Sequence, residues 1–150
     1  MPIPSFDQFG LLPGGIHSCT FEEVEAVLAW NRPRRQLTDQ LRDFIRAELK
    51  PRFPVVPPLV LAGSFVTAEA NPADINLVLE LHHLSDHDKM QGLLLCQRVP
   101  AIFLRYRVEL TAALQSPGND FVAYYQHLNP RKAIAMNLFH GHKKGLLRMH

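Results

Sequence analysis

A short apolar run closed by glycine and serine, followed by an alternating segment, constrains this chain more than any other feature. Leu59–Ala62 is apolar throughout and ends at Gly63, which is typical of a buried strand. Asp74–Leu81 alternates in character and predicts a second strand with two distinct faces. The core face is expected to hold Ile75, Leu77, Leu79 and Leu81. The other face carries Asp74, Asn76, Val78 and Glu80.

Helical patterns precede these strands. Thr20 followed by Glu23 is a capping-box pattern, and the apolar spacing after it predicts a short helix ending near Asn31. Pro33 suits the first turn of a second helix, because a proline there loses no hydrogen bond. That second helix is expected to stop at Lys50.

A helix and a strand are expected after the alternating segment. Ser85 can cap a helix running to about Val99, where Pro100 interrupts it. Arg105–Ala112 alternates and predicts a third strand. One face of that strand would carry Arg105, Arg107 and Glu109.

The two ends of the chain complete the expected order. The prolines and glycines before Ser18 predict an extended arm over residues 1–18. Asn119 or Asp120 is expected to open a last helix through Leu128. The order of elements predicts the α+β class, with a small mixed β-sheet flanked by helices in one domain over residues 1–150.

Composition excludes several classes of protein. Apolar residues make up 47% and charged residues 20% of the 150, which does not fit a disordered chain or a coiled coil. No apolar run approaches the roughly 20 residues that a membrane-spanning helix needs. Cys19 and Cys96 lack metal-ligand spacing, which favours reduced thiols in the cytoplasm. A net charge of only +2 makes nucleic acid an unlikely partner.

The C-terminal segment, residues 129–150, is locally basic. It holds no acid and five cations, namely Arg131, Lys132, Lys143, Lys144 and Arg148. Both a solvated tail and a phosphate-facing surface are compatible with this charge.

The polar residues at the end of the first predicted strand and the start of the second indicate a binding site for phosphate and a divalent cation. Gly63 lets a backbone approach a ligand, and the Ser64 hydroxyl with the amides after it can hold a phosphate. Asp74 and Asn76 are alternate strand positions and project oxygen ligands from one face. Glu109 from a neighbouring strand can complete an oxygen cage of the kind that Mg²⁺ prefers.

These residues resemble the signature of the polymerase-β-like nucleotidyltransferase superfamily: Gly-Ser, a spacer, Asp-x-Asp on a strand and a third carboxylate on a later strand. The wider pattern is similar to one bacterial family of that superfamily and spans nearly the whole chain. The segments that carry it are Leu12–His17, Asn31–Arg35, Gly63–Thr67, Pro72–Ile75 and Lys144–Arg148.

The resemblance implies a nucleotidyltransferase that binds a nucleoside triphosphate with Mg²⁺ or Mn²⁺ and transfers a nucleoside monophosphate to an acceptor hydroxyl. It implies a metal site formed by Asp74, Asn76 and Glu109. In it Asp74 and Glu109 would be catalytic, with Glu109 accepting the proton of the attacking hydroxyl. The nucleotide phosphates would contact Gly63, Ser64, Lys143, Lys144 and Arg148.

Asn76 departs from this pattern, because the superfamily usually has its second aspartate there. An amide oxygen can ligate a metal but contributes no charge. The competing interpretation is therefore a catalytically silent fold that acts as an antitoxin-like or immunity-like binding partner of another protein.

Structural explanations for the same residues also stay open. Asp74 can simply start a strand after turn chemistry, and Ser64 can be an ordinary turn serine. Glu109 can be an exposed strand residue paired with Arg105 or Arg107. If the catalytic interpretation is right, Asp74 and Glu109 share one sheet face within reach of the Ser64 backbone, and the basic C-terminal residues border the same cleft.

Overall fold

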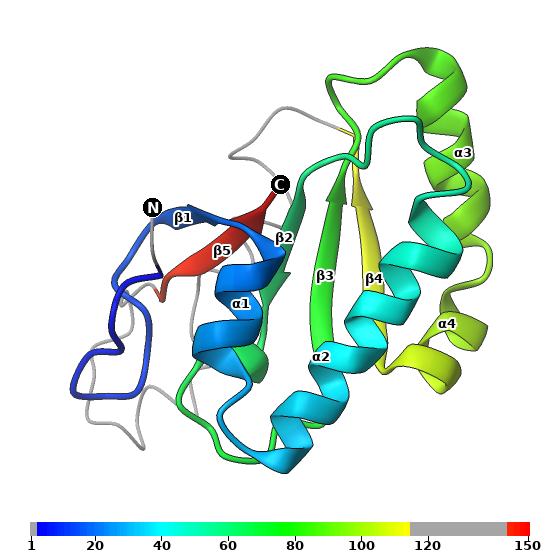
Figure 1. The fold of residues 1–150 in the computed structure, drawn as a ribbon. Coiled ribbons are helices and arrows are strands. Elements are labelled where there is room, and N and C mark those ends of the chain that lie inside the picture. Colours follow the sequence, from blue (N-terminus) through cyan, green and yellow to red (C-terminus); the bar gives the residue numbers. More distant parts are fainter. Residues whose placement is uncertain (1–2, 115–143) are drawn as a thin grey trace.

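A five-stranded sheet carries the fold (Figure 1). The computed structural model describes residues 3–114 and 144–150, and within them the strand order is β1-β5-β2-β3-β4. The strands are β1 (Ile16–Cys19), β2 (Leu59–Ala62), β3 (Ile75–Glu80), β4 (Val108–Ala113) and β5 (Leu146–Met149).

The strand directions make the sheet mixed. β2 runs antiparallel to β3 and to β5. β3 is parallel to β4, and β1 is parallel to β5. As a result, β2 ends at the same end of the sheet at which β3, β4 and β5 begin. We call this the Gly63 end, because Gly63 directly follows β2.

Helices cover this sheet, so the predicted α+β class with a mixed sheet flanked by helices is confirmed. The helices are α1 (Phe21–Leu28), α2 (Arg32–Phe44), α3 (Asp86–Cys96) and α4 (Val99–Tyr106), with a π-helical turn η1 (Ile45–Leu49) and a 3-10 turn η2 (Ser64–Val66). α1 and α2 lie across one face of the sheet, while α3 and α4 flank β4 (Figure 1). Among the described residues, no helix combines the length and apolar character needed to cross a bilayer.

The predicted start signals of the first two helices are confirmed. The Thr20 hydroxyl accepts from the Glu23 amide, and the Glu23 carboxylate accepts from the Thr20 amide. Asn31 caps α2 by accepting from the Arg34 amide, and Pro33 lies in the first turn. α1 ends at Leu28, before the predicted Asn31, because Asn31 is used as the cap of the next helix.

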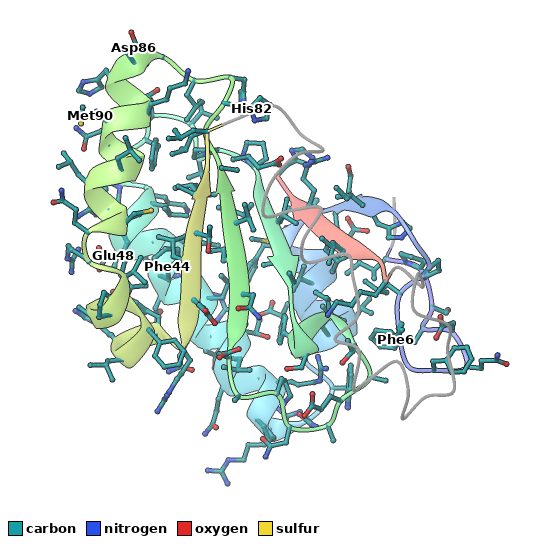
Figure 2. The ribbon with its side chains drawn as sticks, turned by 180° about the vertical axis from the view of Figure 1, so that it is seen from behind. Phe6, Phe44, Glu48, His82, Asp86 and Met90 are labelled. Carbon is teal, nitrogen blue, oxygen red and sulfur yellow. The ribbon has the colours of Figure 1, made fainter. Side chains whose placement is uncertain are left out.

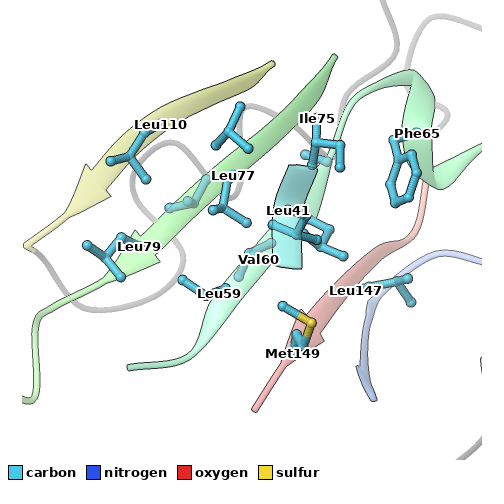
Figure 3. Close-up of a cluster of buried hydrophobic side chains, with 14 of the residues drawn as sticks. Leu41, Leu59, Val60, Phe65, Ile75, Leu77, Leu79, Leu110, Leu147 and Met149 are labelled. Carbon is cyan, nitrogen blue, oxygen red and sulfur yellow. The ribbon is translucent and has the colours of Figure 1, made fainter. Parts of the chain in front are cut away.

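The core lies between α2 and the sheet face that the alternation of β3 predicts to be apolar (Figure 3). Ile75, Leu77 and Leu79 are fully buried on that face. Leu41 and Phe44 of α2 are equally buried and belong to the same cluster. Full burial of each such side chain contributes roughly 1.5–3 kcal/mol, so this layer is the main source of stability.

The helix capped by Ser85 ends at Cys96, before Pro100 as predicted, but the expectation that a strand begins at Arg105 is wrong. Pro100 lies in the first turn of α4, where its missing amide costs nothing, and Arg105 belongs to that helix. The strand begins at Val108 instead. Arg107 adopts a left-handed conformation, which ends α4 and redirects the chain into β4.

The expected extended arm and the expected basic tail both prove to contain strands. Ile16–Cys19 pairs in parallel with Leu146–Met149, and the latter strand inserts between β1 and β2. The C-terminal part of residues 129–150 is thus an interior strand rather than a solvated tail. The last predicted helix, 119–128, lies outside the described residues.

A buried carboxylate joins the end of α2 to the α3–α4 layer (Figure 2). Glu48 is only 5% exposed, and it accepts hydrogen bonds from Arg98 at 2.6 Å and from the Tyr106 hydroxyl at 3.0 Å. Arg52 adds an ion pair at 3.2 Å. Burial by itself works to raise the pKa of Glu48, but the bonds from Arg98 and Tyr106 and the charges of Arg98 and Arg52 together hold that pKa below its usual value.

Candidate functional site

The Gly63 end of the sheet starts with a tight turn that requires glycine. Gly63 has φ 79°, which is in the left-handed region. A Cβ atom at this position would lie 2.2 Å from the side-chain nitrogen of Asn76. Gly63 therefore lets the Asn76 amide lie directly over the backbone where β2 turns into η2.

The register of the central strands brings two of the predicted site residues together. Asn76 pairs with Ala62 of β2 on one side and with Glu109 of β4 on the other. Paired residues project to the same face of a sheet, so the Asn76 and Glu109 side chains are neighbours. Glu109 is exposed on β4, which lies at the edge of the sheet, so solvent and ligands can reach its carboxylate.

Asp74 lies one residue before β3, with the same parity as Asn76, and is half-buried. Burial raises the pKa of the Asp74 carboxyl, and the nearby charge of Arg107 opposes this rise. The positive charge of Arg107 thus favours the ionised form of the Asp74 carboxyl. Within residues 3–114 and 144–150, Glu109 has no ion pair with Arg105 or Arg107.

A buried arginine, whose role the sequence did not predict, donates hydrogen bonds to the turn after Gly63. Arg34 of α2 is fully buried, and its guanidinium donates only to backbone carbonyls. The acceptors are the carbonyls of Leu28, Ser64, Phe65, Thr67 and Glu69. Burial lowers the pKa of Arg34 to about 10, and the charge of Glu69 opposes this, so the guanidinium stays charged at neutral pH.

These bonds fix the loop after β2 in one conformation. Within the loop, the amides of Val66 and Thr67 donate to the carbonyls of Gly63 and Ser64, at 3.3 and 3.1 Å. Asn31, the cap of α2, also reaches this loop and donates to the Ala70 carbonyl at 2.6 Å. The Arg34 guanidinium lies 3.7 Å from the centre of the Trp30 ring, so an aromatic side chain covers its outer face.

The N-terminal and C-terminal motif segments close over the same end. Gly145 donates to the Leu12 carbonyl at 3.0 Å, and a Cβ at Gly145 would lie 2.0 Å from the Pro13 carbonyl oxygen. Leu11 forms a β-bridge with Thr67. The segments Leu12–His17 and Lys144–Arg148 therefore contact each other, and Arg34 of a third segment contacts the loop after Gly63.

The basic C-terminal residues separate in the structure. Lys144 directly precedes Gly145, so its backbone lies at the Gly63 end. Arg148 is paired with Val60 in the register and forms two hydrogen bonds with the Glu80 carboxylate, at 2.7 and 3.0 Å, further along the sheet. Because the buried Glu80 takes its guanidinium, Arg148 does not join Lys144. Lys143 lies outside the described residues.

Comparison with known proteins gives one match. Residues 4–150 match DUF6932, which is described as a family of unknown function. The chain belongs to the DUF6932 family. No curated protein and no solved structure matches this DUF6932 chain significantly.

The donor set of the DUF6932 chain at the Gly63 end consists of oxygen atoms. Asp74 and Glu109 offer carboxylates and Asn76 offers an amide carbonyl, which suits a hard cation that keeps water and phosphate oxygens as further ligands. No group of three or more His, Cys, Asp or Glu side chains that could hold a metal occurs in the described ranges. A divalent cation at this site would therefore need oxygen ligands beyond those of Asp74, Asn76 and Glu109.

The DUF6932 chain also has a cavity of about 380 Å³ at the opposite end of the sheet. Leu59 at the start of β2 and Met149 at the end of β5 form part of its floor. Arg46 and Lys50 lie on its rim. This cavity is separated from Asn76 and Glu109 by the length of the strands, so it plays no part in the site described above.

Proposed function

We propose that this protein binds a nucleoside triphosphate with Mg²⁺ or Mn²⁺ at the Gly63 end and transfers the nucleoside monophosphate to an acceptor hydroxyl, in the cytoplasm. The observation that carries the proposal is the row formed by Ala62, Asn76 and Glu109 across three strands, next to the turn at Gly63. A turn that holds phosphate beside a carboxylate serves positioning and electrostatic stabilisation, which supply most of the catalysis in phosphoryl transfer.

Gly63 and Ser64 have the role of holding the phosphates. The Asn76 amide fills the space over Gly63, so a phosphate would meet this amide together with the turn, and Arg34 holds the loop that follows. Rigid donors do not have to reorganise during reaction, which is the main advantage of such a loop. Lys144, whose backbone lies at the same end, adds positive charge near the bound phosphates.

Asp74, Asn76 and Glu109 would hold the divalent cation. When bound, the cation supplies positive charge to the phosphate oxygens and lowers the cost of charge developing on the leaving group. Asn76 contributes a ligand without charge, so the affinity of the free protein for the cation is expected to be low.

The bond changes follow from the substrate. The acceptor oxygen forms a bond to the α-phosphorus, the bond from that phosphorus to the bridging oxygen breaks, and pyrophosphate leaves with the electron pair. The proton of the acceptor hydroxyl passes to the carboxylate of Glu109. The exposure of Glu109 on the edge strand leaves room for the acceptor to approach.

Asn76 supports a second candidate function. With a neutral residue at the position between Ala62 and Glu109, the site has two carboxylates rather than three. A protein that kept the fold and lost the chemistry would act as a binding partner, such as an antitoxin-like or immunity-like regulator of another protein.

Titration calorimetry with each of the four nucleoside triphosphates, with and without Mg²⁺ or Mn²⁺, tests the proposal. A parallel assay follows transfer of label from an α-phosphate-labelled triphosphate to components of a cell extract. Glu109→Gln is the matched variant, because it keeps the size of the side chain and removes the proton acceptor. Because Glu109 is also a proposed ligand of the cation, we expect the variant to transfer none, to bind the Mg²⁺-nucleotide more weakly, and to bind the nucleotide without cation at least as tightly as the wild type.

The outcomes separate the two candidates. Nucleotide binding with transfer that depends on Glu109 supports the enzyme. Binding without transfer in either protein favours the silent partner. No binding of any triphosphate under any condition rejects a nucleotide site at the Gly63 end altogether.

A further inference from the structure

Arg107 occupies a backbone conformation that an arginine rarely adopts. Among the described residues it is the non-glycine residue with positive φ, at φ 56° and ψ 32°. Glycine or asparagine would end α4 here with less steric cost. An arginine at this position is therefore explained more readily by a role of its guanidinium than by the backbone.

The backbone of Arg107 lies beside the proposed nucleotide site. Its carbonyl accepts from the Ile75 amide at 3.0 Å, so Arg107 lies across from Asp74 at the start of β3. Its charge acts on the Asp74 carboxyl. It stands two residues before Glu109, it is exposed to solvent, and its guanidinium lies 5.4 Å from the centre of the Phe103 ring.

The charge of the site gives Arg107 a role. Asp74 and Glu109 contribute two negative charges, whereas Asn76 contributes none. A nucleoside triphosphate brings several negative charges, which the site must neutralise. A guanidinium binds phosphate oxygens through two parallel N–H donors, which a point charge cannot do.

We propose that Arg107 is a phosphate-binding residue of this site, and that its guanidinium replaces part of the divalent charge, so that the protein binds a nucleoside triphosphate even without a divalent cation. This inference rests on the proposed function. It adds that the neutral Asn76 and the positively charged Arg107 guanidinium act together. Asn76 lowers the affinity for the metal, and Arg107 supplies a fixed positive charge in its place.

Four variants test this role. Arg107→Gly and Arg107→Asn remove the charge and tolerate the left-handed backbone, so at least one of them is expected to fold. Arg107→Lys keeps the charge and loses the paired donors. Arg105→Gln is the matched control, because Arg105 is exposed at the end of the same helix. Thermal unfolding of every variant checks that it is folded.

Binding of ATP and GTP is measured by calorimetry in EDTA and again in Mg²⁺, at two salt concentrations. We expect the wild type to bind in EDTA. Loss of Arg107 should weaken that binding at least tenfold, the effect of one charged hydrogen bond. The loss should be smaller in Mg²⁺, Arg107→Lys should fall between, and Arg105→Gln should match the wild type.

Three results would overturn the inference. One is wild-type binding that requires the divalent cation. Another is wild-type binding in EDTA that both uncharged variants at Arg107 retain. The third is an equal loss in EDTA and in Mg²⁺, which would mean that the guanidinium does not replace divalent charge. All three leave the proposed function standing, whereas a wild type that binds no nucleotide in either buffer rejects both.

Discussion

Replacing Arg34 by methionine tests the account of the loop after β2. Methionine keeps a side chain of similar length and removes every donor. In the wild type the Arg34 guanidinium donates to the carbonyls of Phe65 at 2.8 Å and Leu28 at 3.1 Å, and both bonds are buried. It also donates to three partly exposed carbonyls, those of Ser64, Thr67 and Glu69.

The expected loss of stability follows from these contacts. Each of the two buried carbonyls costs about 1–3 kcal/mol when it is left unsatisfied. The partly exposed carbonyls cost less, because water can replace the donor. Loss of the stacking on Trp30 adds roughly 0.5–1 kcal/mol. We therefore expect Arg34→Met to lower the free energy of unfolding by about 3–6 kcal/mol, out of a total of roughly 5–15 kcal/mol for a domain.

Urea denaturation followed by circular dichroism measures this loss, and thermal unfolding should show a midpoint lower by roughly 10 °C. Arg35→Met is the matched control, since Arg35 is the next residue in α2 and is exposed. Its unfolding free energy should stay within about 0.5 kcal/mol of the wild type. A loss below about 1 kcal/mol in Arg34→Met would refute the claim that this arginine holds the loop.

Three further perturbations test the site and the core. Because Gly63 has a positive φ, Gly63→Ala should lower the unfolding free energy by about 1–3 kcal/mol, and it should also weaken nucleotide binding by displacing Asn76. Gly15 has a positive φ but nothing within 4 Å of its would-be Cβ, so Gly15→Ala should leave the nucleotide affinity measured by calorimetry unchanged. The lowered pKa of Glu48 stabilises the wild type above the ordinary carboxyl pKa of 4.5, and this stabilisation is lost as the pH falls through the lowered pKa. Glu48→Gln lacks it, so the unfolding free energies of the two proteins should differ at pH 7 and converge on acidification; a difference that stays constant between pH 7 and pH 3 would contradict this. Asn76→Asp should tighten Mg²⁺-nucleotide binding and, without metal, lower the thermal midpoint by a few degrees through repulsion with Asp74; a midpoint that falls and does not recover on adding Mg²⁺ and nucleotide would favour the silent partner.

Local sequence signals determined the elements whose stabilising contacts lie close in the chain. The capping box at Thr20, the proline at the start of α2 and the cap at Ser85 each act within four residues, so the sequence alone places them. The alternation over β3 also predicts which side chains share a face, because the period of a strand fixes the direction of every side chain, but it did not predict that Val78 and Glu80 on the other face are buried as well. The mixed α+β class follows from the order of such elements.

Only the tertiary structure decided the contacts between distant segments. β1 and β5 are four residues each and pair with one another from opposite ends of the chain, so neither has a strong pattern of its own. Arg148 is occupied by Glu80, and this pairing depends on β5 lying beside β2. A proline that follows the end of one helix can also start the next, as Pro100 does in α4, which packs against β4.

The candidate site divides in the same way. The sequence placed Gly63, Asp74, Asn76 and Glu109 in order, but their grouping depends on the register of three strands. The sequence places Arg34 in a motif segment and Arg107 near Glu109, but it gives neither residue a role. The carbonyls that Arg34 satisfies come mainly from a loop some 30 residues away, and the conformation of Arg107 arises where α4 must turn into β4. Residue types fix which charges are available, whereas only the fold fixes which of them meet.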